Sequence, residues 1–201
     1  MDNINIKVVD ASDLLRYIND IARLRIEVFR TFPYLYDGDI DYEKDYLRKY
    51  NTAAGAVCVL ALEHNRVVGA STGLPMVHEA HGVQSPFLEA GYDVRKIFYF
   101  GESVLLKSYR GRGIGHAFFD HREAHALTLP GIEMTAFCAV DRPDDHPLKD
   151  ADYRSLDQFW IKRGYTKQAH MKAHMSWLDI NESEETTKQL TFWTKSLIAN
   201  G

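Results

Sequence analysis

Cysteine is scarce in this 201-residue chain, which holds only Cys58 and Cys138. The two thiols lie far apart in sequence, and each stands inside an apolar run. Two such residues do not make the disulfide framework of a small secreted domain. We therefore expect both to be small buried hydrophobes in a reducing compartment.

Long apolar runs and long basic runs are also missing. No apolar stretch approaches the ~18 residues that a membrane-spanning helix needs, and residues 1–5 lack the basic-then-apolar pattern of a signal peptide. The formal net charge is −4, without the basic face that a nucleic-acid-binding protein usually carries. The sequence thus argues against nucleic-acid and membrane partners and predicts a cytoplasmic protein.

The composition that remains is globular, with 45% hydrophobic and 26% charged residues. The length suits one domain, and no repeat or linker divides the chain, so we expect 1–201 to form a single domain. Hydrophobic periodicity predicts an α/β (α+β) fold with the order β-α-(α)-β-β-(α)-β-α-β-α-β-β. One mixed, mostly antiparallel sheet with helices on both faces fits this order.

The predicted elements are set by periodicity and by the turn residues between them. Strands are expected at 4–9, 56–63, 66–74, 97–106, 132–140, 165–180 and 188–197. Helices are expected at 13–30, near 42–50, from Ser85-Pro86 to Gly91, and at 113–127 and 152–163. In the first helix, Arg25 is the one residue that breaks the apolar spacing.

The loop Tyr109-Arg110-Gly111-Arg112-Gly113-Ile114-Gly115, between a predicted strand and a predicted helix, is the most informative segment. Three glycines at alternate positions let a ligand approach successive backbone N–H groups. The N-terminus of the following helix adds partial positive charge, and two arginines add cationic donors. Together these features predict a pyrophosphate site.

Other interpretations of this loop fit less well. A Walker loop needs Gly-x-x-x-x-Gly-Lys-Ser/Thr, and no such string occurs. A dinucleotide fingerprint needs Gly-x-Gly-x-x-Gly, but here the third glycine comes one residue early. A tight turn with surface arginines is the remaining alternative.

The loop resembles the Arg/Gln-x-x-Gly-x-Gly/Ala signature of the GNAT superfamily of N-acetyltransferases, through Arg110, Gly113 and Gly115. The resemblance includes the flanking 104–106 and 117–119, and the segment 159–165 is similar to the family's later Phe-Tyr-x-x-x-Gly-Phe. Three further strings, 32–36, 101–103 and 142–147, resemble a bacterial subgroup of unassigned substrate.

This resemblance implies acetyl-CoA as co-substrate. Strands 97–106 and 132–140 would run parallel and splay apart, so that the pantetheine arm pairs with free backbone groups of one strand. A backbone N–H near Leu105 would polarise the acetyl carbonyl. The implied cofactor-binding residues are Leu105, Leu106, Lys107, Arg110, Gly111, Arg112, Gly113, Ile114, Gly115, Phe159 and Trp160.

Two residues are candidates for the general base that deprotonates the amine. Glu102 is a carboxylate in a strand, where it is out of place unless it is paired or functional; a structural ion pair with an arginine is the alternative. His146 lies in a polar loop and carries an imidazole, the side chain most used as a general base, although a loop-stabilising role is the alternative. Cys138 has no evident activating partner, so we do not expect a covalent intermediate.

The general acid has no assignment, because Trp160 stands where many family members have tyrosine. Indole cannot supply a proton in the useful range. Tyr153, Tyr99 or water could take that role, or the thiolate could leave unassisted. Trp160 would then pack against the cofactor arm or belong to the core.

The acceptor is expected to be a primary amine of a small molecule. An aromatic, acidic segment that includes Phe32, Tyr34 and Tyr36 favours a cationic amine, whereas Arg142 could hold a carboxylate. A non-catalytic acyl-CoA binder or sensor and a protein-lysine or N-terminal acetyltransferase are the alternatives, and a homodimer is possible. No metal is expected, since we place His121 and His125 beside the core rather than at a zinc site.

Overall fold

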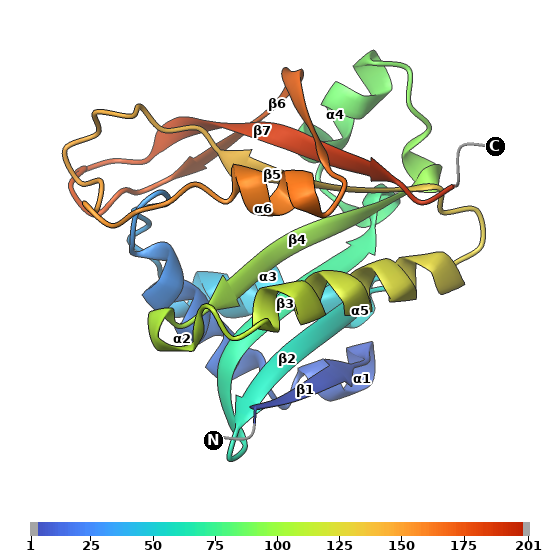
Figure 1. Ribbon diagram of the computed structural model, residues 1–201, viewed down its shortest axis with the longest axis horizontal. Coiled ribbons are helices and arrows are strands. Elements are labelled where there is room, and N and C mark those ends of the chain that lie inside the picture. Colours follow the sequence, from blue (N-terminus) through green and yellow to red (C-terminus); the bar gives the residue numbers. More distant parts are fainter. Residues whose placement is uncertain (1–3, 199–201) are drawn as a thin grey trace.

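The computed structural model describes residues 4–198, and all seven strands of this part of the chain belong to one sheet (Figure 1). The strand order is β1-β2-β3-β4-β5-β7-β6, and only the β4–β5 pair is parallel. The strands are β1 Ile4–Val9, β2 Val57–Glu63, β3 Arg66–Pro75, β4 Ile97–Leu105, β5 Met134–Val140, β6 Thr166–Trp177 and β7 Thr186–Ser196. The prediction of a mixed, mostly antiparallel sheet is confirmed.

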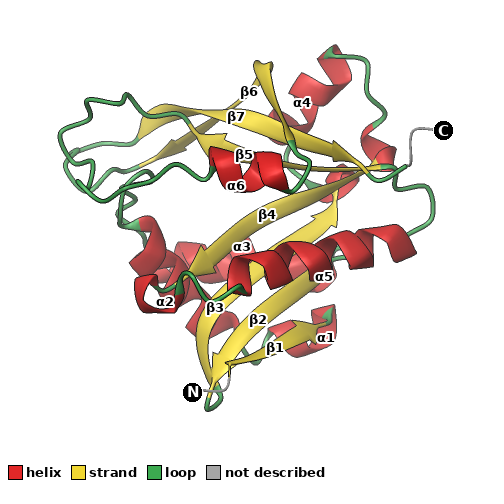
Figure 2. Cartoon of the chain, viewed as in Figure 1, coloured by secondary structure: helices red, strands yellow, loops and turns green. Residues whose placement is uncertain are grey.

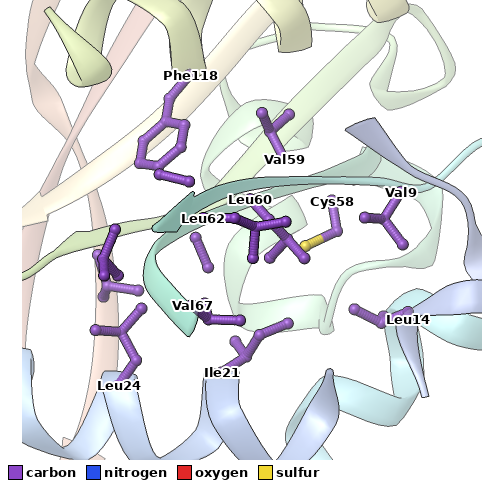
Figure 3. Close-up of a cluster of buried hydrophobic side chains, with 14 of the residues drawn as sticks. Val9, Leu14, Ile21, Leu24, Cys58, Val59, Leu60, Leu62, Val67 and Phe118 are labelled. Atoms are coloured by element: carbon purple, nitrogen blue, oxygen red, sulfur yellow. The ribbon is translucent and has the colours of Figure 1, made fainter. Parts of the chain in front are cut away.

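Helices cover both faces of the sheet (Figure 2). They are α1 Ala11–Leu14, α2 Ile18–Phe29, α3 Ile40–Thr52, α4 His81–Glu89, α5 Ile114–Thr128 and α6 Asp157–Lys162, with 3₁₀ turns at Met76–His78, Val94–Lys96 and Lys107–Tyr109. In Figure 3, Phe118 of α5 lies on one side of β2, and Leu14, Ile21 and Leu24 of α1 and α2 lie on the other. The β1–β4 half of the sheet is therefore the middle layer of three.

Local signals placed the β2–β3 hairpin correctly. His64 and Asn65 both have positive φ, at 46° and 68°, as a two-residue primed turn requires. Such a turn matches the right-handed twist of the strands that it joins. The hairpin sets the register of β3, on which β4 is built.

The first predicted helix is wrong in one respect, because two helices replace it. Two successive hydrogen bonds, each spanning three residues, turn the chain between α1 and α2. Arg16 N–H donates to the Asp13 carbonyl, and Tyr17 N–H donates to the Leu14 carbonyl. Lys7 Nζ of β1 donates to the Tyr17 hydroxyl at 3.1 Å. This contact with β1 stabilises the break between α1 and α2, which helical periodicity does not reveal.

Two other predicted helices have different starts. α4 begins at His81, and Pro86 lies inside it rather than at its first turn. α6 begins at Asp157 instead of residue 152. The Ser155 hydroxyl accepts the Asp157 N–H at 3.1 Å, at the start of the observed helix. The loop before α6 is correspondingly longer than predicted.

Candidate active site

β4 and β5 part after three residue pairs, which creates the opening on which the site depends. The parallel pairs are Ile97 with Met134, Phe98 with Thr135 and Tyr99 with Ala136. Beyond them, within residues 4–198, β4 pairs only with β3, and β5 only with β7 (Figure 1). The predicted splay of these strands is confirmed, and it leaves one edge of β4 without a strand neighbour. A free edge of this kind can bind an extended ligand through its backbone groups.

A β-bulge bends β4 at this point. Ser71 pairs with Ser103 and Gly73 with Phe100, so Thr72 alone faces the two residues Gly101 and Glu102. A bulge bends its strand and locally interrupts the ladder. Burial changes here as well: residues 97–100 are buried, whereas Gly101, Ser103 and Leu105 are at least partly exposed. The bulge thus coincides with the parting of the two strands.

Gly101 is required by close packing. A Cβ built at this position would overlap the hydroxyl of Tyr50 on α3 and lie 2.8 Å from Thr72 Oγ1. Tyr50 is itself 1% exposed and belongs to the core. Only glycine lets the bulge and α3 come this close.

Glu102, the first candidate base, points from the bulge into a buried charge cluster. Its Oε2 atom lies 2.7 Å from Arg25 Nη1 of α2 and accepts the Tyr46 hydroxyl of α3 at 3.2 Å. Arg25 Nε also pairs with Glu43 of α3. Burial opposes the charge on Arg25, but the carboxylates of Glu102 and Glu43 outweigh it and raise the pKa of Arg25. The arginine ion pair considered above is present.

The cluster leaves two carboxylate oxygens without hydrogen bonds among the described residues. They are Glu102 Oε1 and Glu43 Oε1, on side chains that are 3% and 1% exposed. Burial, reinforced by Glu102, raises the pKa of Tyr46 well above its usual value. Tyr46 therefore stays protonated and donates, and the Glu102 carboxylate keeps one oxygen free for a further donor.

On the opposite side of the bulge lies Arg122 of α5, which is 1% exposed. Its Nη1 donates to the carbonyls of Thr72 and Glu102, at 3.1 and 3.2 Å, and its Nη2 donates to Ser103 Oγ at 2.8 Å. The guanidinium carbon is 4.0 Å from the centre of the Phe100 ring. Burial lowers the pKa of Arg122 to about 10, so the side chain is still cationic at neutral pH. The bulge is therefore bonded from both faces of the sheet.

The glycine loop forms the junction between the 3₁₀ turn at Lys107–Tyr109 and α5. Gly111 and Gly113 have φ of 76° and 81°, a region that favours glycine, and Gly113 is the N-cap of α5. The first N–H groups of α5 have no partner within the helix. A Cβ at Gly111 or Gly113 would meet nothing within 4 Å, so the space above the loop is open. Backbone donors at a helix N-terminus that opens onto free space suit a diphosphate.

The basic side chains of this loop are arranged differently from one another. Arg112 turns back, with Nη2 donating to the Ser108 carbonyl at 3.0 Å and the guanidinium above the Tyr109 ring. Arg110 is exposed. Lys107 Nζ lies 3.0 Å from Asp152 Oδ2, which links the end of β4 to the loop before α6. Arg112 and Lys107 are thus engaged within the described structure, and the Arg110 side chain is exposed to solvent.

The two α6 residues occupy different environments. Phe159 lies over the start of α5, since a Cβ at Gly115 would be 3.7 Å from its ring, and its ring centre is 4.9 Å from that of His116. Trp160 packs between Phe137 and Trp193, with ring centres 5.0 and 5.1 Å away. Phe159 is thus beside the glycine loop, whereas the contacts of Trp160 favour the core alternative.

Arg142 and His146 both hydrogen-bond loop backbone in the described structure. Arg142 donates to the carbonyls of Pro33 and Tyr34 at 2.8 Å each and pairs with buried Asp179 at 2.8 Å. His146 Nδ1 accepts the Leu148 N–H at 3.2 Å. These contacts support the loop-stabilising alternative for His146. They also occupy the guanidinium that was predicted to hold an acceptor carboxylate.

The aromatic segment that includes Phe32, Tyr34 and Tyr36 contacts residues that follow β5 and residues at the end of β6. The Phe32 ring centre is 4.7 Å from that of Tyr153, and Tyr34 lies 6.0 Å from Trp177. Tyr36 forms an isolated β-bridge with Asp179. Burial and then the Glu43 carboxylate raise the pKa of Tyr36. Phe32, Tyr34 and Tyr36 are therefore held by contacts with Tyr153, Trp177 and Asp179.

Sequence reasoning missed four residues of this site, namely Arg25 as a partner, Glu43, Tyr46 and Arg122. Arg122 carried a signal, because it shares the i, i+4 stripe of Ile114, Phe118 and Ala126, all buried. The placement of His121 beside the core is wrong, since its side chain is exposed. His125 is half-buried, and its Nε2 bonds the Gly55 carbonyl at 2.8 Å.

Residues 4–198 contain neither a candidate metal cluster nor a helix that could span a membrane. No group of three His, Cys, Asp or Glu side chains is placed to hold a metal ion. None of the helices in that range has the length and apolar character to cross a membrane. Cys58 and Cys138 are both free thiols, as predicted.

No family model and no curated protein sequence matches the chain. Solved structures do match along almost its whole length. An aminoglycoside 6'-N-acetyltransferase complexed with coenzyme A has a TM-score of 0.61 at 15% identity, covering 98% of this chain and 99% of that one. A ribosomal-protein-alanine N-acetyltransferase from Brucella melitensis has a TM-score of 0.61 at 13% identity, covering 96% and 99%.

An acetyltransferase of the GNAT family from Streptococcus pneumoniae has a TM-score of 0.58 at 12% identity, covering 97% of this chain and all of that one. At such low identity the likeness is one of fold. The chain has the fold of the GNAT acetyltransferases, as the resemblance implied.

Proposed function

We propose that this chain is an acetyl-CoA-dependent N-acetyltransferase that acts on a primary amine of a small molecule. The observation that carries the proposal is one continuous arrangement. The free edge of β4, from Gly101 to Leu105, leads into the loop whose glycines open the N-terminus of α5. An extended thioester arm that ends in a diphosphate matches such an edge and such a loop.

The residues present fit acetyl-CoA. The loop offers free N–H donors and open space rather than side chains, Arg110 adds a cation, and Phe159 lies beside Gly115. When bound, the co-substrate supplies an activated acetyl group as a thioester. The chain would hold the arm along residues 105–107 and direct a backbone N–H near Leu105 at the acetyl oxygen.

Glu102 is the proposed general base. Its Oε2 is fixed by Arg25 and Tyr46, while Oε1 has no partner in the described structure and can accept the proton that the acceptor nitrogen loses. The nitrogen then bonds to the acetyl carbon as the carbon–sulfur bond breaks. The departing sulfur takes a proton from solvent or from a nearby hydroxyl.

Neither tyrosine considered as general acid is well suited to that role. The Tyr99 hydroxyl lies 3.1 Å from Cys138 Sγ, and burial raises the pKa of Tyr99 well above its usual value. Burial also raises the pKa of Tyr153. Both groups hold their protons tightly, which favours protonation of the leaving sulfur by solvent.

A small acceptor is supported by the contacts among the loops that carry the predicted acceptor residues. Arg142 binds the loop of Pro33 and Tyr34, and Tyr36 pairs with Asp179, so three loops are tied together there. An open groove for a protein substrate would require these ties to break. Thiol release in the presence of small amines and of peptides separates the two acceptor classes.

The test combines binding with turnover. Calorimetry of the parent protein should show heat on addition of acetyl-CoA, and thiol should be released with at least one amine of a panel. Gly113→Val should abolish the heat, because the side chain enters the open cradle and φ is unfavourable. Gly131→Val is the matched control, since Gly131 also has positive φ, at 80°, and open space but lies after α5.

Three results are informative. Equal affinity of the Gly113→Val and Gly131→Val variants would refute the placement of the diphosphate. Binding without thiol release for any amine or peptide would favour the acyl-CoA sensor instead. Release with peptides alone would favour the protein acetyltransferase.

A further inference from the structure

Arg122 is a cation buried in the middle of α5, and its partners are unusual. It forms no salt bridge within residues 4–198, and its guanidinium nitrogens bond backbone carbonyls and one serine hydroxyl instead. Burying a charge is costly unless hydrogen bonds compensate for lost hydration. A neutral apolar side chain would fill the i, i+4 stripe of this helix at no such cost. The role of Arg122 is therefore to be found in its four hydrogen bonds, which go to three backbone carbonyls and one serine hydroxyl.

Two of its acceptors are the carbonyls at the bulge. Thr72 is the residue of β3 that faces two residues of β4, and Glu102 is one of those two. Because a bulge removes groups from the ladder, carbonyls at this place need other donors. Arg122 Nη1 supplies both bonds from a single atom, and Nη2 bonds Ser103 Oγ, the next side chain along β4.

The bulge at Gly101 and Glu102 lies where β4 leaves β5, directly after Phe100 and the last parallel pair, at Tyr99. Fixing the bulge therefore fixes the direction of the free edge. Arg25 holds the Glu102 side chain from the α2 side, and Arg122 holds the Glu102 carbonyl from the α5 side. Two arginines thus hold Glu102, one through its side chain and one through its backbone carbonyl.

We infer that Arg122 is a positioning residue: its guanidinium fixes the β4 bulge and thereby aligns residues 101–105 with the thioester. This inference rests on the proposed function. It predicts that a change of Arg122 affects acetyl transfer and not acetyl-CoA binding. The reason is that the glycine loop is at the start of α5, about two helical turns from Arg122. The cradle should therefore bind the diphosphate whether or not the bulge is held.

The test uses Arg122→Lys and Arg122→Gln, with Ala126→Gly as control. Lysine keeps the charge but cannot make the forked set of bonds, and glutamine keeps hydrogen bonding without charge. Ala126 is buried on the same helix and makes no hydrogen bond to β4 in the described structure, so Ala126→Gly lowers the melting temperature through helix propensity and the loss of a buried methyl group. We expect both Arg122 variants to lose about 100-fold in kcat, as for a reacting group displaced by ~1 Å. KM for acetyl-CoA should change less than about threefold, in keeping with a loss confined to the transition state.

A second readout does not depend on turnover. The carbonyl stretch of bound, isotopically labelled acetyl-CoA should move to higher frequency in the Arg122 variants and stay unchanged in Ala126→Gly, because polarisation by the β4 backbone is lost. In the free protein, the amides of residues 101–105 should exchange with solvent faster in Arg122→Lys than in Ala126→Gly.

The outcomes can be told apart. If the parent protein acetylates no amine, the proposed function fails, and amide exchange still decides whether Arg122 holds the bulge. Folded Arg122 variants with unchanged kcat, or with unchanged exchange at residues 101–105, would overturn the inference. A loss of kcat that Ala126→Gly reproduces at equal melting temperature would also overturn it.

Discussion

Removing Arg25 would leave two buried carboxylates without their cation. Arg25, Glu43 and Glu102 have side chains that are 9%, 1% and 3% exposed, and one guanidinium serves both acids. Removing one partner of a buried ion pair costs about 3–5 kcal/mol, because the remaining charge stays buried. For a chain of this length each kcal/mol lowers the melting temperature by roughly 2–4 °C, so Arg25→Met should lower it by roughly 6–20 °C.

The assay is urea unfolding at neutral pH, followed by circular dichroism and tryptophan fluorescence. Arg25→Met should unfold at lower urea concentration with an unchanged m value. The triple variant Arg25→Met, Glu43→Gln, Glu102→Gln removes all three charges and should recover part of the lost stability, since an ion cluster can be replaced by neutral groups at little cost. A loss below about 1 kcal/mol for Arg25→Met, the range of exposed pairs, would refute the buried cluster.

Two further predictions concern β4. Glu102→Gln should lower kcat by roughly 10²–10⁴-fold, the usual contribution of a general base, with acetyl-CoA affinity unchanged by calorimetry; a parental rate would rule out Glu102 as the base. Gly101→Ala should destabilise the protein by about 1–3 kcal/mol through overlap with the Tyr50 hydroxyl, and adding Tyr50→Phe should restore part of the loss in urea unfolding; no restoration would mean that Tyr50 is not the obstacle.

Local patterns in the sequence were sufficient for much of the fold. The β2–β3 turn, the N-cap glycine of α5 and the strands β4 and β5 each depend on short-range preferences that neighbouring residues reinforce. The helix boundaries that failed depend on contacts that helical periodicity does not reveal. Tyr17, between α1 and α2, meets Lys7 of β1, and the Ser155 hydroxyl accepts the Asp157 N–H at the start of α6.

The charged centre of the site was only half visible in the sequence. Arg25 broke an apolar helical stripe and Glu102 broke an apolar strand, so each was marked as unusual on its own. Nothing in a single sequence pairs two such residues, because their contact depends on how α2 packs on β4. Two misplaced charges of opposite sign in predicted core elements are a reason to expect a buried pair.

Arg122 extends the same reasoning to the backbone. Its cost of burial is offset by carbonyls that a regular ladder would have satisfied, so the arginine and the bulge depend on each other. Without the bulge, the arginine would lose two of its four acceptors; without the arginine, the Thr72 and Glu102 carbonyls would each lose a donor. A buried arginine without an acidic partner therefore indicates irregular backbone nearby, and in this chain that irregularity is where β4 turns away from β5 and its edge becomes free to bind.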